Sequence, residues 1–136
     1  MPPPGFEVFR SSPFNEHIGP IYVDRSGGSP VFGIEVAAHH GNTHGVAHGG
    51  FLMTVVDLAA GQGTRLLLDG RGGRTVSTTV DFLGAVQIGD WLTASMRLDK
   101  QGGTLAFASV VLTVGDEVVA RASSVLRLAS APPPAS

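Results

Sequence analysis

Cysteine is absent from the 136-residue chain, and charged residues make up only 15% of it. Without cysteine the protein has no disulfide, no thiolate metal site and no cysteine nucleophile. Nine Lys and Arg stand against eleven Asp and Glu, so the chain lacks the basic excess of a nucleic-acid-binding protein. No apolar run approaches the roughly 20 residues that span a bilayer, and the first residues do not resemble a signal peptide. We therefore expect a soluble, cytoplasmic protein that binds neither nucleic acid nor membrane.

The low proportion of charged residues also bears on whether subunits associate. A chain of this length usually forms one domain, and such domains carry about 25% charged residues and about 7% glycine. This chain has fewer charges and 19 glycines, roughly twice the usual share. With so few charges to face water, part of the apolar surface is expected to be buried between subunits.

Proline tracts stand at both ends of the chain, at residues 2–4 and 132–134. Such tracts favour extended conformations without internal hydrogen bonds. We therefore predict a flexible N-terminal tail over residues 1–12, a single domain over 13–129 and a flexible C-terminal tail over 130–136.

The hydrophobic pattern predicts an α+β domain. Apolar residues recur with helical spacing from Phe51 to Leu67, after a loop rich in glycine and histidine. Beyond a turn at 69–73 the period changes to two, which is typical of strands. The predicted strands cover residues 31–38, 75–83, 91–99, 105–114 and 118–128. Short glycine-containing links at 89–90, 102–103 and 115–116 indicate hairpins, so the sheet should be antiparallel.

Two glycines interrupt the predicted helix. Gly61 and Gly63 each cost about 1 kcal/mol relative to alanine in a helix interior. Their presence predicts close packing of the helix against a neighbouring element.

Histidine and glycine alternate in the loop before the helix. His40, His44 and His48 recur every four residues, which on a helix would align three imidazoles for a metal. Glycines 41, 45, 49 and 50 lie among them and argue against helix. We therefore predict no metal site.

Gly49 and Gly50 lie where the loop gives way to the helix. The first amides of a helix lack internal acceptors, and glycine lets a ligand approach the backbone closely. An amide near Gly49 is therefore suited to a carbonyl oxygen that gains negative charge during a reaction. A loop that needs glycine only for its turn explains these two residues as well.

Asp57 is the one acidic residue in the apolar part of the helix. Burying a carboxylate costs several kcal/mol unless it is paired, and aspartate is a mediocre helix former. A carboxylate withdrawn from water suits a general base or a nucleophile. A structural hydrogen bond to a neighbouring subunit is the equally plausible alternative.

The pattern Asn42-x-x-Gly45-x-x-His48-Gly49-Gly50, followed by Asp57 and Gly61, closely resembles the motif of hotdog-fold acyl-CoA thioesterases. Within that superfamily it is most similar to the PaaI-like, phenylacetate-degradation group. The resemblance covers about residues 30–129. It implies a long helix wrapped by an antiparallel sheet, a dimer with a continuous sheet, usually a tetramer of two dimers, and active sites at the dimer interface.

The same resemblance implies catalytic roles for residues of the motif. The Gly49 amide would polarise the thioester carbonyl, and Asp57 from the partner subunit would activate water or attack the carbonyl itself. Asn42 would orient water, and His48 would hold the loop or contact the thioester. Thr75 on the next strand would assist.

Further residues would bind the substrate. Gly50 would shape the turn, and Ser77 is the alternative to Thr75. Phe51, Met53 and Leu83 are expected either in an apolar pocket or in ordinary core. Arg71 or Arg74 would meet coenzyme A phosphates.

We therefore expect an acyl-CoA thioesterase that releases free acid and coenzyme A and needs no cofactor, since coenzyme A is part of the substrate. One alternative is a hotdog dehydratase or hydratase acting on 3-hydroxyacyl thioesters. The other is a non-catalytic acyl-CoA-binding module. The sequence leaves aryl, short-chain and medium-chain acyl groups open.

Overall fold

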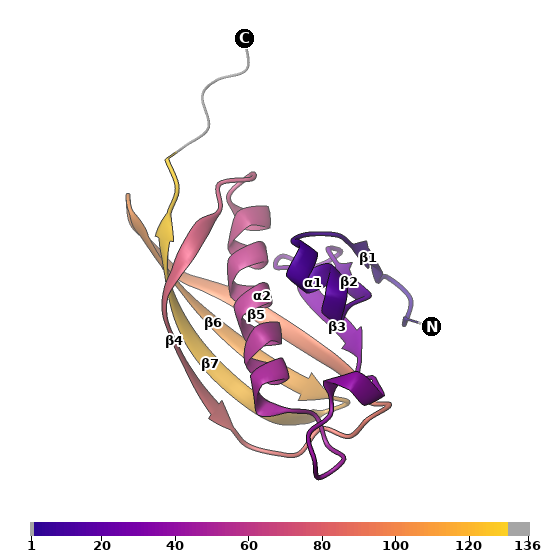
Figure 1. The fold of residues 1–136 in the computed structure, drawn as a ribbon. Coiled ribbons are helices and arrows are strands. Elements are labelled where there is room, and N and C mark those ends of the chain that lie inside the picture. Colours follow the sequence, from indigo (N-terminus) through magenta and orange to yellow (C-terminus); the bar gives the residue numbers. More distant parts are fainter. Residues whose placement is uncertain (1, 131–136) are drawn as a thin grey trace.

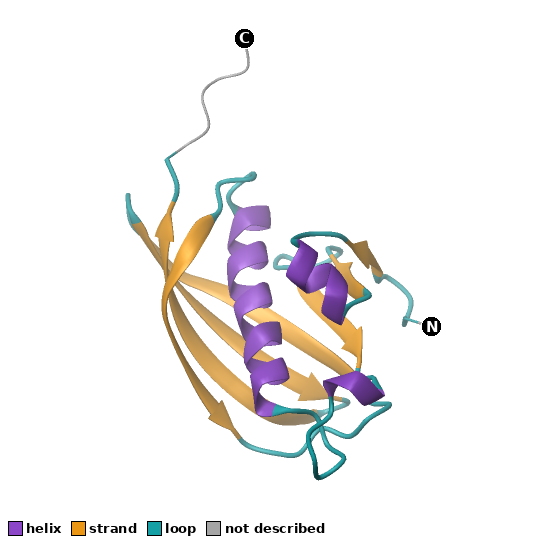
Figure 2. Cartoon of the chain, in the orientation of Figure 1, coloured by secondary structure: helices purple, strands orange, loops and turns teal. Residues whose placement is uncertain are grey.

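The computed structural model describes residues 2–130. One long helix lies against the concave side of a curved, seven-stranded antiparallel sheet (Figure 1), and the helix and strand layers are distinguished by colour in Figure 2. The expected α+β arrangement, a helix wrapped by an antiparallel sheet, is confirmed. The strands are β1 (Glu7–Phe9), β2 (Ile21–Asp24), β3 (Val31–Glu35), β4 (Gly73–Phe82), β5 (Trp91–Gln101), β6 (Leu105–Val114) and β7 (Glu117–Leu128). The helices are α1 (Pro13–Ile18), a 3-10 turn η1 (Ala38–His40) and α2 (Gly49–Leu67).

Helix α2 is held by its apolar face. Residues spaced three and four apart point toward the sheet and are buried, among them Leu52, Val55, Val56, Ala59 and Ala60. They contact β4, β5, β6 and β7, where the alternate residues of each strand complete the core. Among residues 2–130, no helix is long and apolar enough to cross a membrane.

The two helix glycines differ in their surroundings. A Cβ at Gly63 would lie 2.6 Å from Met96 Cγ on β5, so the predicted close approach of helix and sheet is confirmed there. A Cβ at Gly61 would meet nothing within 4 Å, so the predicted close approach is not found there within the single chain. Gly61 lies on the other side of the helix from Met96, because two residues turn the helix by about 200°.

The strand order is β1-β2-β3-β5-β6-β7-β4. The links at 102–103 and 115–116 form hairpins, as predicted, because β5 pairs with β6 and β6 with β7. The predicted hairpin at 89–90 is wrong, since β4 pairs with β7 and β5 with β3. The intervening segment crosses beneath the start of α2 instead: Val86 is buried, and its carbonyl accepts from Ala47 N–H at 2.8 Å.

The folded sheet begins before the predicted domain boundary at residue 13. Strand β1 pairs with β2, and two aromatic rings pack edge-on against the sheet: Phe6 on Trp91 and Phe9 on Phe32. Part of the segment 1–12 that we assigned to a flexible tail therefore belongs to the sheet. Residue 1 of the predicted N-terminal tail and residues 131–136 of the predicted C-terminal tail lie outside the described residues.

Strand β4 forms one edge of the sheet and is ten residues long. Its outer backbone groups pair with no other strand of residues 2–130. Apolar side chains are exposed along this edge, with Val76 62% and Phe82 49% accessible. The opposite edge, β1, has only three residues. A long exposed edge with apolar side chains is a ready template for pairing with another chain.

Replacing Gly33 by alanine tests the packing of the β3–β5 layer. A Cβ at this position would overlap the Trp91 ring and lie 3.0 Å from Phe6 Cε1. Because rigid rings must move, we expect the free energy of unfolding to fall by about 1–3 kcal/mol in urea titrations. Gly28→Ala is the control, since its Cβ would meet nothing within 4 Å, and it should change stability by less than about 0.5 kcal/mol. Equal stabilities of the two variants would contradict this packing.

Candidate active site

Asp57 lies on the exposed face of α2, between two buried residues, Val56 and Leu58. We expected this carboxylate to be withdrawn from water, and in the single chain that expectation is wrong. Each helical residue turns the chain by about 100°, so Val56 and Leu58 fall on opposite flanks of the face that packs on the sheet and Asp57 faces away. The carboxylate is thus presented to whatever approaches the free side of the helix.

Thr75 on β4 holds the Asp57 carboxylate. Its Oγ1 donates to Asp57 Oδ1 at 2.6 Å. A β-bulge lies between Thr75 and Ser77, where the register against β7 shifts by one residue. Bulges redirect side chains and recur beside active sites. Here the bulge leaves Thr75 opposite Leu126, on the helix side of the sheet, and Ser77 opposite Val125, on the other.

At the start of α2 the amide of Gly49 lies next to a capped amide. His48 is the N-cap, and its Nδ1 accepts from Gly50 N–H at 2.8 Å. The proton of a neutral His48 ring must therefore lie on Nε2. The N–H of Gly49 donates to no acceptor among residues 2–130. At a helix N-terminus such an N–H favours negative charge, so the Gly49 amide is able to stabilise an oxyanion.

Asn42 builds the loop that leads to this amide. Its side-chain Oδ1 accepts from the backbone N–H groups of His44 and Val46, at 2.8 and 3.3 Å. Its own N–H donates to Val46 O, and Gly45 has φ +80°, a conformation that favours glycine. Asn42 therefore shapes the tight turn before the helix, and its amide oxygen is already engaged.

His40 is a buried residue of this region that sequence reasoning placed in no role. Its Nδ1 accepts from Ala37 N–H at 2.9 Å, so its Nε2 donates to Ile18 O at 2.7 Å. The ring stacks on Phe51, with ring centroids 4.0 Å apart. Burial lowers the pKa of His40, and nearby His39 acts in the same direction, against the hydrogen bond to Ile18. A neutral His40 thus ties α1 to the loop before α2.

Two pockets flank the exposed side of α2. The first, about 380 Å³, contains Asp57, Thr75 and Ser77. The second, about 440 Å³, contains His48, Gly50 and Phe51. Phe14 of α1 and Thr54 of α2 line both. These predicted residues therefore form two groups along one helix, while Gly49 and Asn42 line neither pocket.

The sequence pattern did not predict helix α1, which carries Phe14, a residue that lines both pockets. The available signal was Ser12-Pro13: Ser12 Oγ accepts from Asn15 N–H at 3.2 Å, and proline occupies the first turn. This pair is typical of a helix start. Phe14 is 60% exposed in the single chain.

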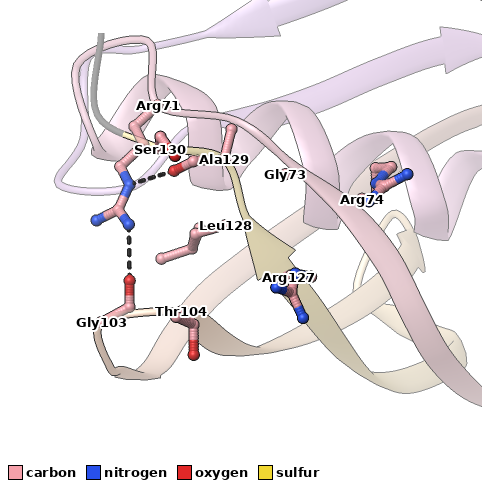
Figure 3. Close-up of a pocket in the computed structure, with 9 residues that line it drawn as sticks. All are labelled: Arg71, Gly73, Arg74, Gly103, Thr104, Arg127, Leu128, Ala129 and Ser130. Carbon is pink, nitrogen blue, oxygen red and sulfur yellow. Dashed lines mark hydrogen bonds between the residues drawn. The ribbon is translucent and has the colours of Figure 1, made fainter. Parts of the chain in front are cut away.

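Two of the predicted substrate-binding residues lie apart from these pockets. Leu83 follows β4, is exposed, and donates its N–H to Val119 O. Arg74 lines a third pocket, shown in Figure 3, with Arg71 and Arg127. Met53, the third candidate for an apolar pocket, lines the pocket of Asp57.

The long helix wrapped by an antiparallel sheet defines the class: this is a hotdog-fold protein with a carboxylate and a free helix amide on one helix. The thioesterase superfamily model matches residues 44–121. The protein PA0474 of Pseudomonas aeruginosa, assigned as an esterase, is 36% identical over 93% of this chain and 96% of its own. Human acyl-coenzyme A thioesterase 13 is 30% identical over 74% of this chain and 72% of its own.

Among solved structures, the PaaI protein from the phenylacetic acid degradation operon of E. coli has the same fold. Its TM-score is 0.79 at 23% identity, over 88% of this chain and 86% of its own. The chain belongs to the thioesterase superfamily, and it is a thioester hydrolase.

The lowered pKa of His40 predicts a pH dependence of stability. As pH falls below about 6.5, the unfolded chain takes up a proton that the folded His40 does not. The free energy of unfolding should then fall by up to about 1.4 kcal/mol per pH unit from this residue, until pH reaches the lowered folded pKa. Urea titrations from pH 8 to pH 5 measure the slope.

Two variants separate the contribution of His40 from that of other groups. His40→Asn should be less stable at neutral pH and lose this part of the slope. His44→Asn, in the exposed loop, should keep the wild-type slope. A wild-type slope in His40→Asn would show that another group is responsible.

Proposed function

We propose that the protein is an acyl-CoA thioesterase, hydrolysing an acyl- or aryl-CoA thioester to free acid and coenzyme A. The observation that carries this proposal is the pairing, on one exposed helix, of an unoccupied Gly49 amide with a carboxylate held by Thr75 at 2.6 Å. Thioester hydrolysis needs a donor for the carbonyl oxygen and a base or nucleophile for the carbonyl carbon. The kinship with acyl-coenzyme A thioesterase 13 supports coenzyme A as the thiol.

In the proposed reaction the Gly49 N–H hydrogen-bonds the thioester oxygen, and this bond strengthens as the oxygen gains negative charge. Asp57 takes a proton from the attacking water, whose oxygen bonds to the carbonyl carbon, and the C–S bond breaks as the tetrahedral intermediate collapses. The departing thiolate receives the proton. In the alternative route the Asp57 carboxylate itself attacks the carbonyl carbon, and the C–S bond breaks to form an anhydride and the coenzyme A thiolate. Water then hydrolyses the anhydride to free acid and the Asp57 carboxylate, and the thiolate takes up the remaining proton.

The other predicted site residues have supporting roles in this proposal. Thr75 orients the Asp57 carboxylate, which leaves its second oxygen for the proton. His48 and Asn42 fix the loop and thereby the direction of the Gly49 amide. Gly50 stays unsubstituted because a Cβ there would lie 3.0 Å from His48 Nδ1. Phe51, beside the helix start, borders the space for the acyl group, and Ser77 borders the pocket of Asp57.

The distance between the two groups supports a site shared by two copies of the chain. Gly49 and Asp57 are eight residues apart in α2, or roughly 12 Å along the helix axis. A group that attacks a carbonyl lies within about 3.5 Å of its carbon, and the oxyanion donor within about 3.1 Å of its oxygen. The Gly49 N–H also points off the end of the helix, away from Asp57. One chain does not supply both groups to one carbonyl.

The exposed edge of β4 supports the same arrangement. Pairing of β4 with the β4 of a second copy would continue the sheet and cover Val76 and Phe82. Strand β4 lies beside α2 of its own chain. Pairing of the two β4 strands would therefore also bring Asp57 and Thr75 of one copy toward the start of α2 in the other. We propose a homodimer with two such sites, and two dimers in a tetramer.

Asp57→Asn tests the proposed chemistry, because asparagine keeps the shape of the side chain and removes its basicity. We expect kcat/KM to fall roughly a hundredfold to ten-thousandfold in thiol-release assays over a panel of aryl- and alkyl-CoA thioesters. Folding should be unaffected, since residue 57 is exposed.

Asp69→Asn is the matched control. It also removes one exposed carboxylate, and asparagine tolerates the φ of 52° found there. Its activity should equal that of the wild type. Wild-type activity in Asp57→Asn would exclude Asp57 as base or nucleophile.

A further inference from the structure

Two arginines stand directly opposite each other on the outer face of the sheet. Arg74 of β4 and Arg127 of β7 are register partners, so their side chains leave the sheet on the same side. Like charges opposite each other destabilise a strand pair. A nearby carboxylate usually offsets such repulsion. The ion pairs among residues 2–130 involve Arg10, Arg97 and Arg121 and leave Arg74 and Arg127 without an acidic partner.

A third arginine closes this region from the other side. Arg71 donates from Nε to Ala129 O and from Nη2 to Gly103 O, both at 2.7 Å (Figure 3). Neutral carbonyls do not cancel the charge of the guanidinium, which stays protonated. Arg71 therefore fixes the β5–β6 turn to the end of β7 and adds a third positive charge.

The three arginines line one cavity of about 560 Å³, which we call the arginine pocket. Its other walls include the backbone of Gly73 and Gly103 and the side chains of Thr104 and Leu128. No Asp or Glu is among the described residues that line it. Three cations, the hydroxyls of Thr104 and Ser130 and no carboxylate make a pocket whose complement is a multiply charged anion.

We propose that the arginine pocket binds the phosphate groups at the nucleotide end of the thioester substrate, with Arg74 and Arg127 as a clamp and Arg71 as the residue that positions its wall. This inference rests on the proposed function for the identity of the ligand. Guanidinium groups match phosphate oxygens in charge and geometry, and paired arginines bind them in a fixed orientation.

The position of the pocket fits this role. Arg74 immediately precedes Thr75, whose hydroxyl holds Asp57, and the two side chains leave β4 on opposite faces at the same sheet edge. The pantetheine arm that joins thioester to phosphates spans about as much as four extended residues, roughly 14 Å. An arm of that length passes around the N-terminal end of β4, at Gly73, from the reacting carbonyl to the arginines, and leaves the rest of the edge free to pair with a second copy.

Substrates with and without phosphates test the proposal. The variants are Arg127→Gln and Arg74→Gln, with Arg25→Gln as a control that removes the same charge from an exposed loop residue outside the pocket. Each is assayed with a CoA thioester and with the N-acetylcysteamine thioester of the same acyl group. We expect KM for the CoA thioester to rise roughly tenfold in each pocket variant, with kcat unchanged.

The N-acetylcysteamine thioester should show no change in KM, because it lacks phosphates. Arg127→Lys should recover part of the affinity, since it restores the charge without the fork. An unchanged KM for the CoA thioester in Arg127→Gln and Arg74→Gln would overturn the clamp.

Calorimetric titration with adenosine 3′,5′-bisphosphate separates this proposal from the proposed function. Binding to the wild type that is lost in Arg127→Gln supports the pocket even if no thioester is hydrolysed. If the wild type turns over CoA thioesters and Arg127→Gln binds the bisphosphate equally well, the pocket assignment fails and the proposed reaction stands.

Discussion

The packing of α2 into the concave sheet is the interaction on which the other features depend. Leu52, Val55, Val56 and Ala59 bury one side of the helix, which fixes the helix as a straight rod and turns its other side outward. That outward side carries Asp57, and the end of the rod carries the Gly49 amide. Since an α-helix rises about 1.5 Å per residue, their separation is set by the same hydrogen bonds that make the helix. The Asp57 carboxylate and the Gly49 amide of one chain are therefore held apart whether or not substrate is bound.

Strand β4, at the edge of the sheet, contributes residues to both the pocket of Asp57 and the arginine pocket. On its inner face Thr75 holds the carboxylate, and on its outer face Arg74 stands beside Arg127. Arg74 and Thr75 are neighbours in regular register, so their side chains lie on opposite faces, and the bulge follows Thr75. In our proposals this edge pairs with a second copy and so completes the catalytic groups, while the N-terminal end of β4 leads the substrate from carbonyl to phosphates. The low charge of the chain, 15%, is consistent with surfaces that a partner covers.

Much of the fold was predictable because local signals were strong. The helix and the four C-terminal strands show clear periods of 3.6 and 2, and their observed bounds differ from the predicted ones by two residues or fewer. Strand β1 and helix α1 were missed because they span three and six residues, too few to show a period. The partner of β4 was mispredicted because pairing across the sheet depends on tertiary packing, which turn residues do not encode. The contact between Thr75 and Asp57 was expected from the family motif. The surroundings of His40 and Arg127 depend on contacts between segments that are distant in the sequence.

The central claim is that a working site takes its carboxylate from one copy of the chain and its amide from another, and mixing two inactive variants tests it most directly. One variant is Asp57→Asn. The other is Gly49→Pro, which removes the amide N–H at a helix position that accepts proline; Gly49→Ala keeps the N–H and should stay active. When the inactive pair is refolded together in equal amounts, half of the dimers are mixed and each holds one intact site, so about one quarter of wild-type activity should return. A mixture as inactive as its components would contradict the shared site.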